Sequence, residues 1–167
     1  MEKVSHPRFN RRDLFFAAIA LAVIIADQLT KLWIKTHLQL GEVLWNAGLF
    51  RIIRVQNTGA AFGIFPGHTT ALIVIDFIGI FVLLWLVLFL RNRWPFIDRM
   101  PVRVGIGLIL GGTIGNLIDR LYVGQVTDFI DFKIWPVWNV SDMAVTIGVI
   151  VLAYCLIFLA DRGRAKE

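Results

Sequence analysis

The sequence predicts an all-α membrane protein with four transmembrane helices and a small extracytoplasmic β element between the first two helices. Three observations support this fold class. The 167-residue chain is 57% hydrophobic, and its mean hydropathy of +0.72 is too high for an ordinary soluble domain. Four segments reach the roughly 20 apolar residues that span a bilayer. Basic residues gather at alternate connections between these segments. We therefore expect a single four-helix domain over residues 1–167.

The predicted spans cover about residues 14–34, 70–90, 102–121 and 140–160. Helices are expected because backbone polar groups inside lipid must be satisfied internally, which excludes open sheets. Basic residues precede the first span, fill the connection between the second and third spans, and form the C-terminal tail. The positive-inside rule then places both termini and this middle connection in the cytoplasm. The pI of about 9.9 follows from this topology and from attraction to membrane lipids, so no nucleic-acid partner is expected.

The first predicted span ends in charged residues. Asp27 and Lys31 are four residues apart, so they share a helix face and can pair. A basic start and the apolar run 14–26 also fit a cleavable signal peptide, but these charges follow directly and no convincing cleavage site does. We expect a retained span, in which the Asp27–Lys31 pair is a structural anchor rather than a substrate contact.

The first connection, of about 35 residues, is long for a small bundle and is predicted to hold the β element at about residues 40–65. Segment 49–55 is rich in β-branched residues and partly alternates, which is typical of a strand. Glycines and small residues follow from Asn57 to Gly63 and permit close backbone approach. A membrane-surface sheet that receives an extended peptide by strand addition fits this pattern, and so does an ordinary surface hairpin.

The second and third predicted spans carry polar and small residues. Asp76 is the one acid of the second span, and a structural hydrogen bond to a neighbour is the favoured interpretation. The third span holds two stripes at four-residue spacing, which favour close helix packing and group polar side chains near the outer end: Gly107, Gly111 and Gly115, and Gly112, Asn116 and Arg120. For the adjacent Asp119, a terminal ion pair is the favoured interpretation.

The third connection, residues 122–138, is expected to be a loop that carries Asp128 and Asp131. Pro136 ends regular structure just before the fourth span. Asp142 falls in or near the first turn of that span, where the helix dipole favours a carboxylate. From its position alone, Asp142 is as well explained by helix capping as by chemistry.

Two neighbouring carboxylates can hydrolyse a peptide bond. The reaction needs a group that activates water and a proton donor for the oxyanion and the leaving amine. A carboxylate pair supplies both, because mutual repulsion leaves one member protonated and the other ionised near neutral pH. Asp128 and Asp142 are joined by a short segment, so they can meet at the outer membrane surface. The sequence thus favours an aspartic protease for membrane-embedded substrates.

Other catalytic classes lack support in the sequence. The three histidines are scattered, and neither the His-Glu-x-x-His zinc pattern nor the Gly-x-Ser-x-Gly elbow occurs. Cys155 lies in the middle of the fourth span and is expected to be a packing residue. A dyad of Ser141 and Lys133 has no supporting spacing. We therefore expect no metal ion and no cofactor.

Five motifs follow one another through nearly the whole chain: Asp27–Lys31, Asn57–Phe62, Gly111–Leu121, Val126–Phe132 and Trp138–Asp142. In these motifs the chain resembles the lipoprotein signal peptidases (signal peptidase II), a family of bacterial intramembrane aspartic proteases. The resemblance implies that Asp128 and Asp142 are the catalytic pair. It also implies a set of residues that line, brace or support the site: Asn57, Asn116, Arg120, Asn139, Asp27, Lys31, Asp119 and Gly112.

The resemblance further implies a function and a location. The expected substrate is a prolipoprotein whose cysteine already carries diacylglycerol, and cleavage just before that cysteine removes the signal peptide. The expected enzyme is a monomer of the bacterial inner membrane with its site on the extracytoplasmic side. Two departures from the family pattern stand out: Ser141 replaces the usual alanine, and the stretch between the two aspartates is shorter than in many relatives.

Several alternatives stay open at this level. Asp119 and, less so, Asp131 compete with Asp128 for the first catalytic position. A proton- or ion-translocating bundle would use Asp27, Asp76 and Asp142, although these acids do not form a relay across the membrane. A non-enzymatic assembly subunit would use the glycine stripes of the third span only for helix packing.

Overall fold

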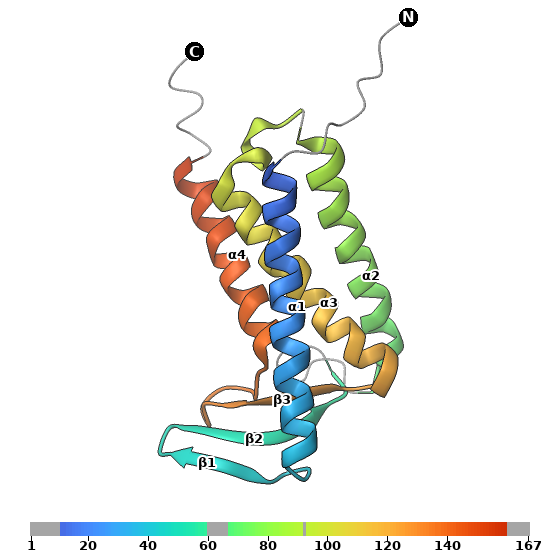
Figure 1. The fold of residues 1–167 in the computed structure, drawn as a ribbon, viewed down its shortest axis with the longest axis vertical. Helices are drawn as coiled ribbons and strands as arrows, with labels where there is room; N and C mark the ends of the chain where they lie inside the picture. The colour runs from blue at the N-terminus through green and yellow to red at the C-terminus, as the bar shows by residue number, and fades with distance from the viewer. Residues whose placement is uncertain (1–10, 60–66, 92, 160–167) are drawn as a thin grey trace, which may run out of the picture.

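The computed structural model of the chain describes residues 11–59, 67–91 and 93–159. Four helices run side by side, and a small antiparallel sheet lies at one end of the bundle (Figure 1). All four helices are long and apolar enough to cross a membrane. The predicted four-helix architecture with a small β element is therefore confirmed. Residues 60–65 of the predicted β region, Ala160 of the fourth span and the basic C-terminal tail lie outside the described residues.

The helices match the predicted spans closely. They are α1 (Arg11–His37), α2 (Thr69–Trp85), α3 (Met100–Val123) and α4 (Val140–Leu159). Helix α2 continues as a π-helical turn, η2 (Leu86–Leu90), and a short 3₁₀ helix, η3 (Pro95–Asp98), leads into α3. Helix α1 extends beyond its predicted span at both ends, because the charged residues that flank the apolar stretch remain helical.

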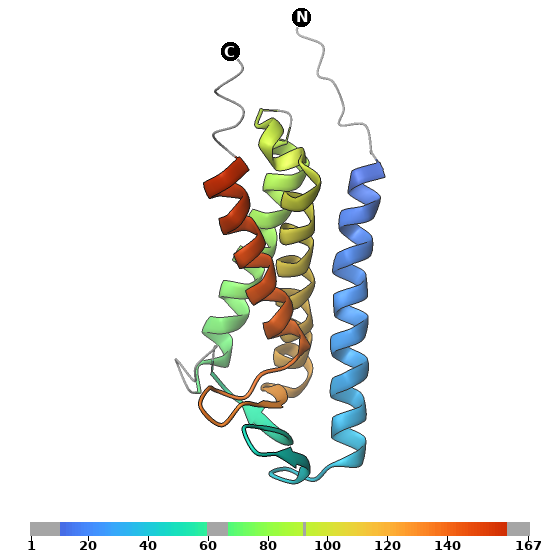
Figure 2. The ribbon, with the colours of Figure 1, turned by 90° about the vertical axis from the view of Figure 1, so that its left-hand side faces the viewer.

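Helix α3 is the central element of the bundle. It packs against α1, α2 and α4, whereas α2 packs mainly against α3 (Figure 2). Two glycine faces permit this arrangement. A Cβ atom at Gly111 would lie 2.6 Å from the Ala20 carbonyl oxygen of α1, and one at Gly112 would overlap the Ser141 carbonyl oxygen of α4. The predicted stripes of small residues thus hold α3 against two different helices.

The sheet contains one strand more than expected. Strands β1 (Val43–Ala47) and β2 (Phe50–Asn57) form a hairpin, and β3 (Val126–Asp131) pairs antiparallel with β2. The strand order is β1-β2-β3. The expectation that residues 122–138 form only a loop was wrong for β3. Gly124, with φ of 77°, ends α3 in the left-handed conformation and turns the chain into this strand.

The sheet is fixed to the end of α1. Arg54 of β2 donates hydrogen bonds to the carbonyl oxygens of Lys35 (3.1 Å) and Leu38 (2.7 Å), at the C-terminal end of that helix. Beside these contacts, Ile34, Leu38 and Phe129 form a small apolar core between α1 and β3. A cation at the helix C-terminus also complements the helix dipole. The position of β3 is therefore set by α1 as well as by β2.

The other end of the bundle holds a cluster of arginines and aspartates. Arg103 is fully buried and donates to Asp13 (2.8 Å) and Asp98 (2.9 Å). Arg91, at the end of η2, also pairs with Asp13. The cluster joins the first turn of α1 to the segments on either side of η3. An apolar core that includes the fully buried Cys155 lies next to it along the bundle.

Candidate active site

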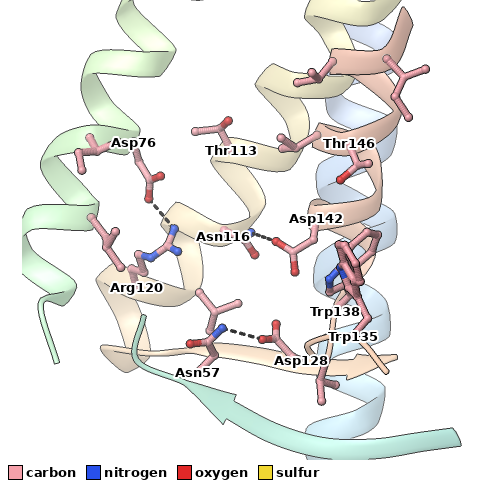
Figure 3. Close-up of a pocket in the computed structure, with 17 residues that line it drawn as sticks. Asn57, Asp76, Thr113, Asn116, Arg120, Asp128, Trp135, Trp138, Asp142 and Thr146 are labelled. Carbon is pink, nitrogen blue, oxygen red and sulfur yellow. Dashed lines mark hydrogen bonds and ion pairs between the residues drawn. The ribbon is translucent and has the colours of Figure 1, made fainter. Parts of the chain in front are cut away.

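The side chains of Asp128 and Asp142 point into one cavity at the sheet end of the bundle (Figure 3). The cavity has a volume of about 530 Å³. Asp128 comes from β3, in which alternate side chains face opposite sides, so Val126 and Asp128 line the cavity while Thr127 does not. Asp142 comes from the first turn of α4. Asp128 is 2% exposed, so it is a buried strand residue and not a surface-loop residue as expected.

The segment between the two aspartates returns to its own strand. The backbone of Trp138 exchanges hydrogen bonds with that of Ile130 (2.7 and 2.8 Å), and its carbonyl oxygen also accepts from Phe129 (2.8 Å). This bridge places the start of α4 beside β3. This short connection therefore brings Asp142 to the same cavity as Asp128.

Asn139 connects the two aspartates. It is fully buried, and its side-chain amide donates to Oδ1 of Asp128 at 2.7 Å. Its backbone N–H donates to Oδ2 of Asp142 at 3.2 Å, while its side-chain oxygen accepts from the backbone N–H of Asp142 at 2.9 Å. The last two bonds form a capping box at the start of α4. Asp142 thus takes part in the helix cap through Oδ2 alone.

Two further asparagines complete the hydrogen bonding of the pair. Asn57 of β2 donates to Oδ2 of Asp128 at 3.0 Å, and Asn116 of α3 donates to Oδ1 of Asp142 at 2.8 Å (Figure 3). Among the described residues, neither aspartate forms an ion pair. Every donor to these four carboxylate oxygens from the described residues is therefore an amide, which leaves both acids without a cationic partner there.

Burial and charge repulsion favour a proton on Asp128. Desolvation is the larger cause and the neighbouring Asp142 carboxylate the next, and together they raise the pKa of Asp128 to about 7. Hydrogen bonds from Asn57 and Asn139 act in the opposite direction but are outweighed. Such a pair titrates as a unit, and near neutral pH it holds one proton.

A buried ionic network supports the segments that carry the two aspartates. Lys31 of α1 lies 2.8 Å from Asp27 and 3.2 Å from Asp119. Asp27 accepts the backbone N–H of Ser141 at 2.9 Å, and Asp119 accepts that of Thr127 at 3.1 Å. Each of these N–H groups belongs to the residue just before one of the aspartates. The ion pair expected within α1 therefore holds β3 and α4 in place.

The neighbourhood of Ser141 explains why Gly112 and Gly115 are small. The Ser141 hydroxyl is buried and has no hydrogen-bond partner among the described residues. A Cβ atom at Gly115 would overlap it, and would lie 2.7 Å from an Asp27 carboxylate oxygen. Since only the backbone N–H of Ser141 is used, an alanine at this position would keep the contact to Asp27.

Arg120 and Asp76 form the opposite wall of the cavity. The Arg120 guanidinium of α3 pairs with the Asp76 carboxylate of α2 at 2.8 Å (Figure 3). Asp76 therefore does bond a neighbour, as expected, but its place on the cavity wall was not foreseen. An acid within an apolar helix was the only sequence signal for it. Mostly apolar side chains form the remaining walls: Leu72, Ile75, Val126, Val137, Val145, Val149, Ile150, Trp135 and Trp138. Of these, Val126 and Trp138 lie in the sequence motifs, but none was predicted to line the site.

The two rival acids have other partners. Asp119 is paired with Lys35 (2.9 Å) as well as with Lys31. Asp131 does not line the cavity. Burial favours its neutral form, but the Lys133 backbone N–H and the Arg51 guanidinium outweigh burial and lower the pKa of Asp131.

The acids of the alternative proton pathway, Asp27, Asp76 and Asp142, all find their partners near the sheet end of the bundle. Over the described ranges, no three His, Cys, Asp or Glu side chains are grouped so that they would hold a metal ion.

Comparisons with known proteins agree on one family. A family model described as signal peptidase (SPase) II matches residues 19–158. A lipoprotein signal peptidase of Dehalococcoides mccartyi is 45% identical over 152 residues, which cover 91% of this chain and 94% of the relative. One of Moorella thermoacetica is 42% identical over 151 residues, with coverages of 89% and 97%. A bacterial membrane enzyme solved at 2.3 Å resolution shares 33% identity and a TM-score of 0.77 over 92% of both chains.

The range matched by the family model includes most or all of each helix and every residue of the candidate site, and the relatives are matched over nearly their full length. The four apolar helices fit a multi-pass membrane protein, and the matching family consists of peptidases. The chain therefore belongs to the signal peptidase II family.

Proposed function

We propose that this chain is an aspartic endopeptidase that removes signal peptides from diacylglyceryl-modified prolipoproteins by cleaving before the lipidated cysteine. The observation that carries the proposal is the pair Asp128 and Asp142, which face one cavity, share Asn139 as a donor and lack ion-pair partners among the described residues. The names of the relatives supply the substrate class. The pair supplies the reaction type.

The chemistry follows from one shared proton. The ionised aspartate takes a proton from a water molecule as that water attacks the scissile carbonyl carbon. The protonated aspartate donates to the carbonyl oxygen, which stabilises the tetrahedral intermediate. Proton return to the leaving amine then breaks the C–N bond. No metal ion or cofactor enters this sequence of steps.

The walls of the cavity suit a lipidated peptide. The apolar side chains of α2 and α4 provide a surface for hydrocarbon. Asn57, Asn116 and Arg120 supply polar groups at the same depth as the two aspartates, where peptide carbonyls or ester oxygens would lie. These contacts would place the bond to be cut between the two carboxyl groups.

The location follows from charge. The end of the bundle opposite the sheet carries Arg12, Arg91 and Arg103, and the positive-inside rule puts such an end in the cytoplasm. The sheet and the cavity then face the extracytoplasmic side of the bacterial inner membrane. A monomer remains our expectation, because all residues of the candidate site come from one chain.

The proposal is tested by cleavage of a diacylglyceryl-modified precursor in detergent or lipid vesicles. Asp128→Asn and Asp142→Asn should each lower kcat/KM by at least about 100-fold, because each removes a proton-transfer group. Asp131→Asn is the matched control, since it makes the same change on the same strand but outside the cavity. Retained cleavage in either dyad variant, or cleavage of unlipidated and lipidated precursors at equal rates, would contradict the proposal.

A further inference from the structure

Lys31 is buried between two carboxylates and one side-chain amide. Its side chain is 1% exposed, and Nζ lies 2.8 Å from Asp27, 2.9 Å from Asn116 Oδ1 and 3.2 Å from Asp119. The side-chain oxygen of Asn116 accepts a hydrogen bond from the ammonium group, and the two carboxylates lie within ion-pair distance of it. Two of the partners are carboxylates, and one of them, Asp119, is also paired with Lys35. The third is a neutral amide, which an ion-pair role alone does not require.

Asn116 passes the contact on to Asp142. Its Oδ1 accepts from Lys31, and its Nδ2 donates to Asp142 Oδ1 at 2.8 Å. A cation on the carbonyl oxygen polarises the amide and makes its N–H a stronger donor. One asparagine thus separates the ammonium group from Asp142. The side-chain path from the ammonium group to Asp128 is longer, because it passes through both Asn116 and Asn139.

The helix terminus acts in the same direction. Asp142 lies in the first turn of α4 and accepts the Asn139 backbone N–H, whereas both donors to Asp128 are side-chain amides. The dipole of a helix favours a negative charge at this end. The two carboxyl groups therefore differ in environment, although each accepts two hydrogen bonds from the residues that the structure describes.

We propose that Lys31 is a positioning residue that, acting through Asn116, keeps Asp142 ionised as the general base and leaves the shared proton on Asp128. The inference rests on the proposed function. In the reaction, Asp142 takes a proton from water while the water oxygen bonds to the carbonyl carbon, and Asp128 protonates the carbonyl oxygen. Asp142 then gives its proton to the leaving nitrogen as the C–N bond breaks, and Asp128 recovers its proton from the intermediate's hydroxyl.

The other charged groups near the pair are matched with one another. Arg120 of α3 is paired with Asp76 of α2, and Lys35 of α1 is paired with Asp119. Asp27 is bound by Lys31, and β2 contributes only the neutral Asn57. Among these groups, Lys31 is the cation that one amide connects to Asp142. The pKa of about 7 for Asp128 is consistent with a proton on that residue.

The first test is the pH profile of kcat/KM for wild type and for Lys31→Met and Asn116→Leu. Both variants should move the acid-side limb to higher pH by about one unit, with a smaller move of the alkaline limb, because the base loses the donor that favours its ionised form. Lys31→Arg should shift the acid-side limb less than Lys31→Met does, because the substitution keeps a positive charge at this position. Asp27→Asn is the matched control, since it weakens the ion pair but leaves the link from Lys31 to Asn116 and should not move the acid limb upward.

A purely structural role predicts a different result. All four variants would then lower the unfolding temperature and kcat together, while both limbs of the pH profile of kcat/KM stay at their wild-type pH. That result would overturn the inference. Equal moves of the two limbs would also overturn it, because the effect would then not be specific to one aspartate.

The second test does not depend on turnover. In an Asp128→Asn background, the infrared carboxyl band of Asp142 should show an ionised group at pH 6 with Lys31 present and a largely protonated group with Lys31→Met. Identical spectra would refute the role of Lys31 whether or not the enzyme cleaves. Failure of the wild type to cleave a lipidated precursor would instead refute the proposed function, so the two failures are distinguishable.

Discussion

At the scale of single residues, the site depends on amides that hold two acids without neutralising them. Asn57, Asn116 and Asn139 donate to Asp128 and Asp142. A lysine or arginine in their place would form an ion pair and fix both acids in the charged form. Amides leave one proton to be shared. This difference separates the catalytic candidates from Asp27, Asp76 and Asp119, which all have cationic partners.

The raised pKa of Asp128 predicts a pH-dependent stability. The native state keeps a proton on Asp128 up to about pH 7, whereas an unfolded chain releases it near about pH 4. The native state therefore binds more protons in this window, and its free energy of unfolding falls as the pH rises through it. An asparagine at this position does not titrate, so Asp128→Asn does not lose stability in this way. The unfolding temperature of the variant minus that of the wild type should therefore increase as the pH rises from 4 to 8.

Asp131→Asn is the opposite-sign control for this measurement. The lowered pKa of Asp131 gives a stabilisation that is present above about pH 4 and lost as the pH falls. This variant should therefore be less stable than wild type at neutral pH, with a smaller difference in acid. Parallel curves for the two variants in a thermal-shift series would contradict the assignment of these pKa directions.

At the scale of elements, α3 acts as the spacer that sets the distance between its neighbours. Gly111 lets α1 approach and Gly112 lets the start of α4 approach, so the aspartate in the first turn of α4 is placed by the absence of a side chain on α3. The sequence showed this glycine spacing directly. Which stripe meets which helix depends on the packing of three helices and could not be derived from spacing alone.

Gly112→Ala should lower kcat/KM by about 10-fold or more, because the added methyl overlaps the Ser141 carbonyl and displaces Asp142 from its hydrogen bonds. Gly79→Ala on α2 is the matched control. It has no neighbour within 4 Å, so activity should be unchanged and the helix more stable by up to about 1 kcal/mol. Cleavage rates and unfolding temperatures of both variants test this prediction. Equal effects of the two substitutions on cleavage would contradict the role given to Gly112.

Strand β3 is the element that the sequence did not predict. Hydropathy predicts long apolar helices well, because lipid leaves few alternatives. The segment Val126–Asp131 carries two acids and was expected to be part of a loop. In the structure, the amides of Asn57 and Asn139 satisfy one acid, and Arg51 satisfies the other. Those partners are distant in sequence, except Asn139, so no local pattern shows that this strand can be buried.

At the scale of the whole molecule, the two ends of the bundle differ in kind. The sheet end holds the cavity and the carboxylate pair, and the opposite end holds the cluster of Arg91, Arg103, Asp13 and Asp98. Composition and the distribution of basic residues predicted this polarity. The pairing of Arg120 with Asp76, 44 residues away, was not predictable, because it requires knowing which faces of α2 and α3 meet.

The proposed orientation predicts which end a membrane-impermeant maleimide reaches in intact cells. Leu49→Cys, at the hairpin between β1 and β2, should react from outside, since this side chain is 73% exposed. Trp94→Cys, between η2 and η3, is 59% exposed and should react only after the membrane is permeabilised. Cys155 is fully buried and provides an unreactive background. The reverse pattern of labelling would invert the assigned topology.

The apolar walls that α2 and α4 give the cavity affect how such an enzyme meets its substrate. A lipid-anchored precursor can approach by lateral diffusion within the leaflet, so the search takes place in two dimensions. The relevant concentration is then the number of precursors per lipid and not per litre. Diluting the membrane with additional phospholipid should slow turnover, even when the amounts of enzyme and precursor per volume are held constant.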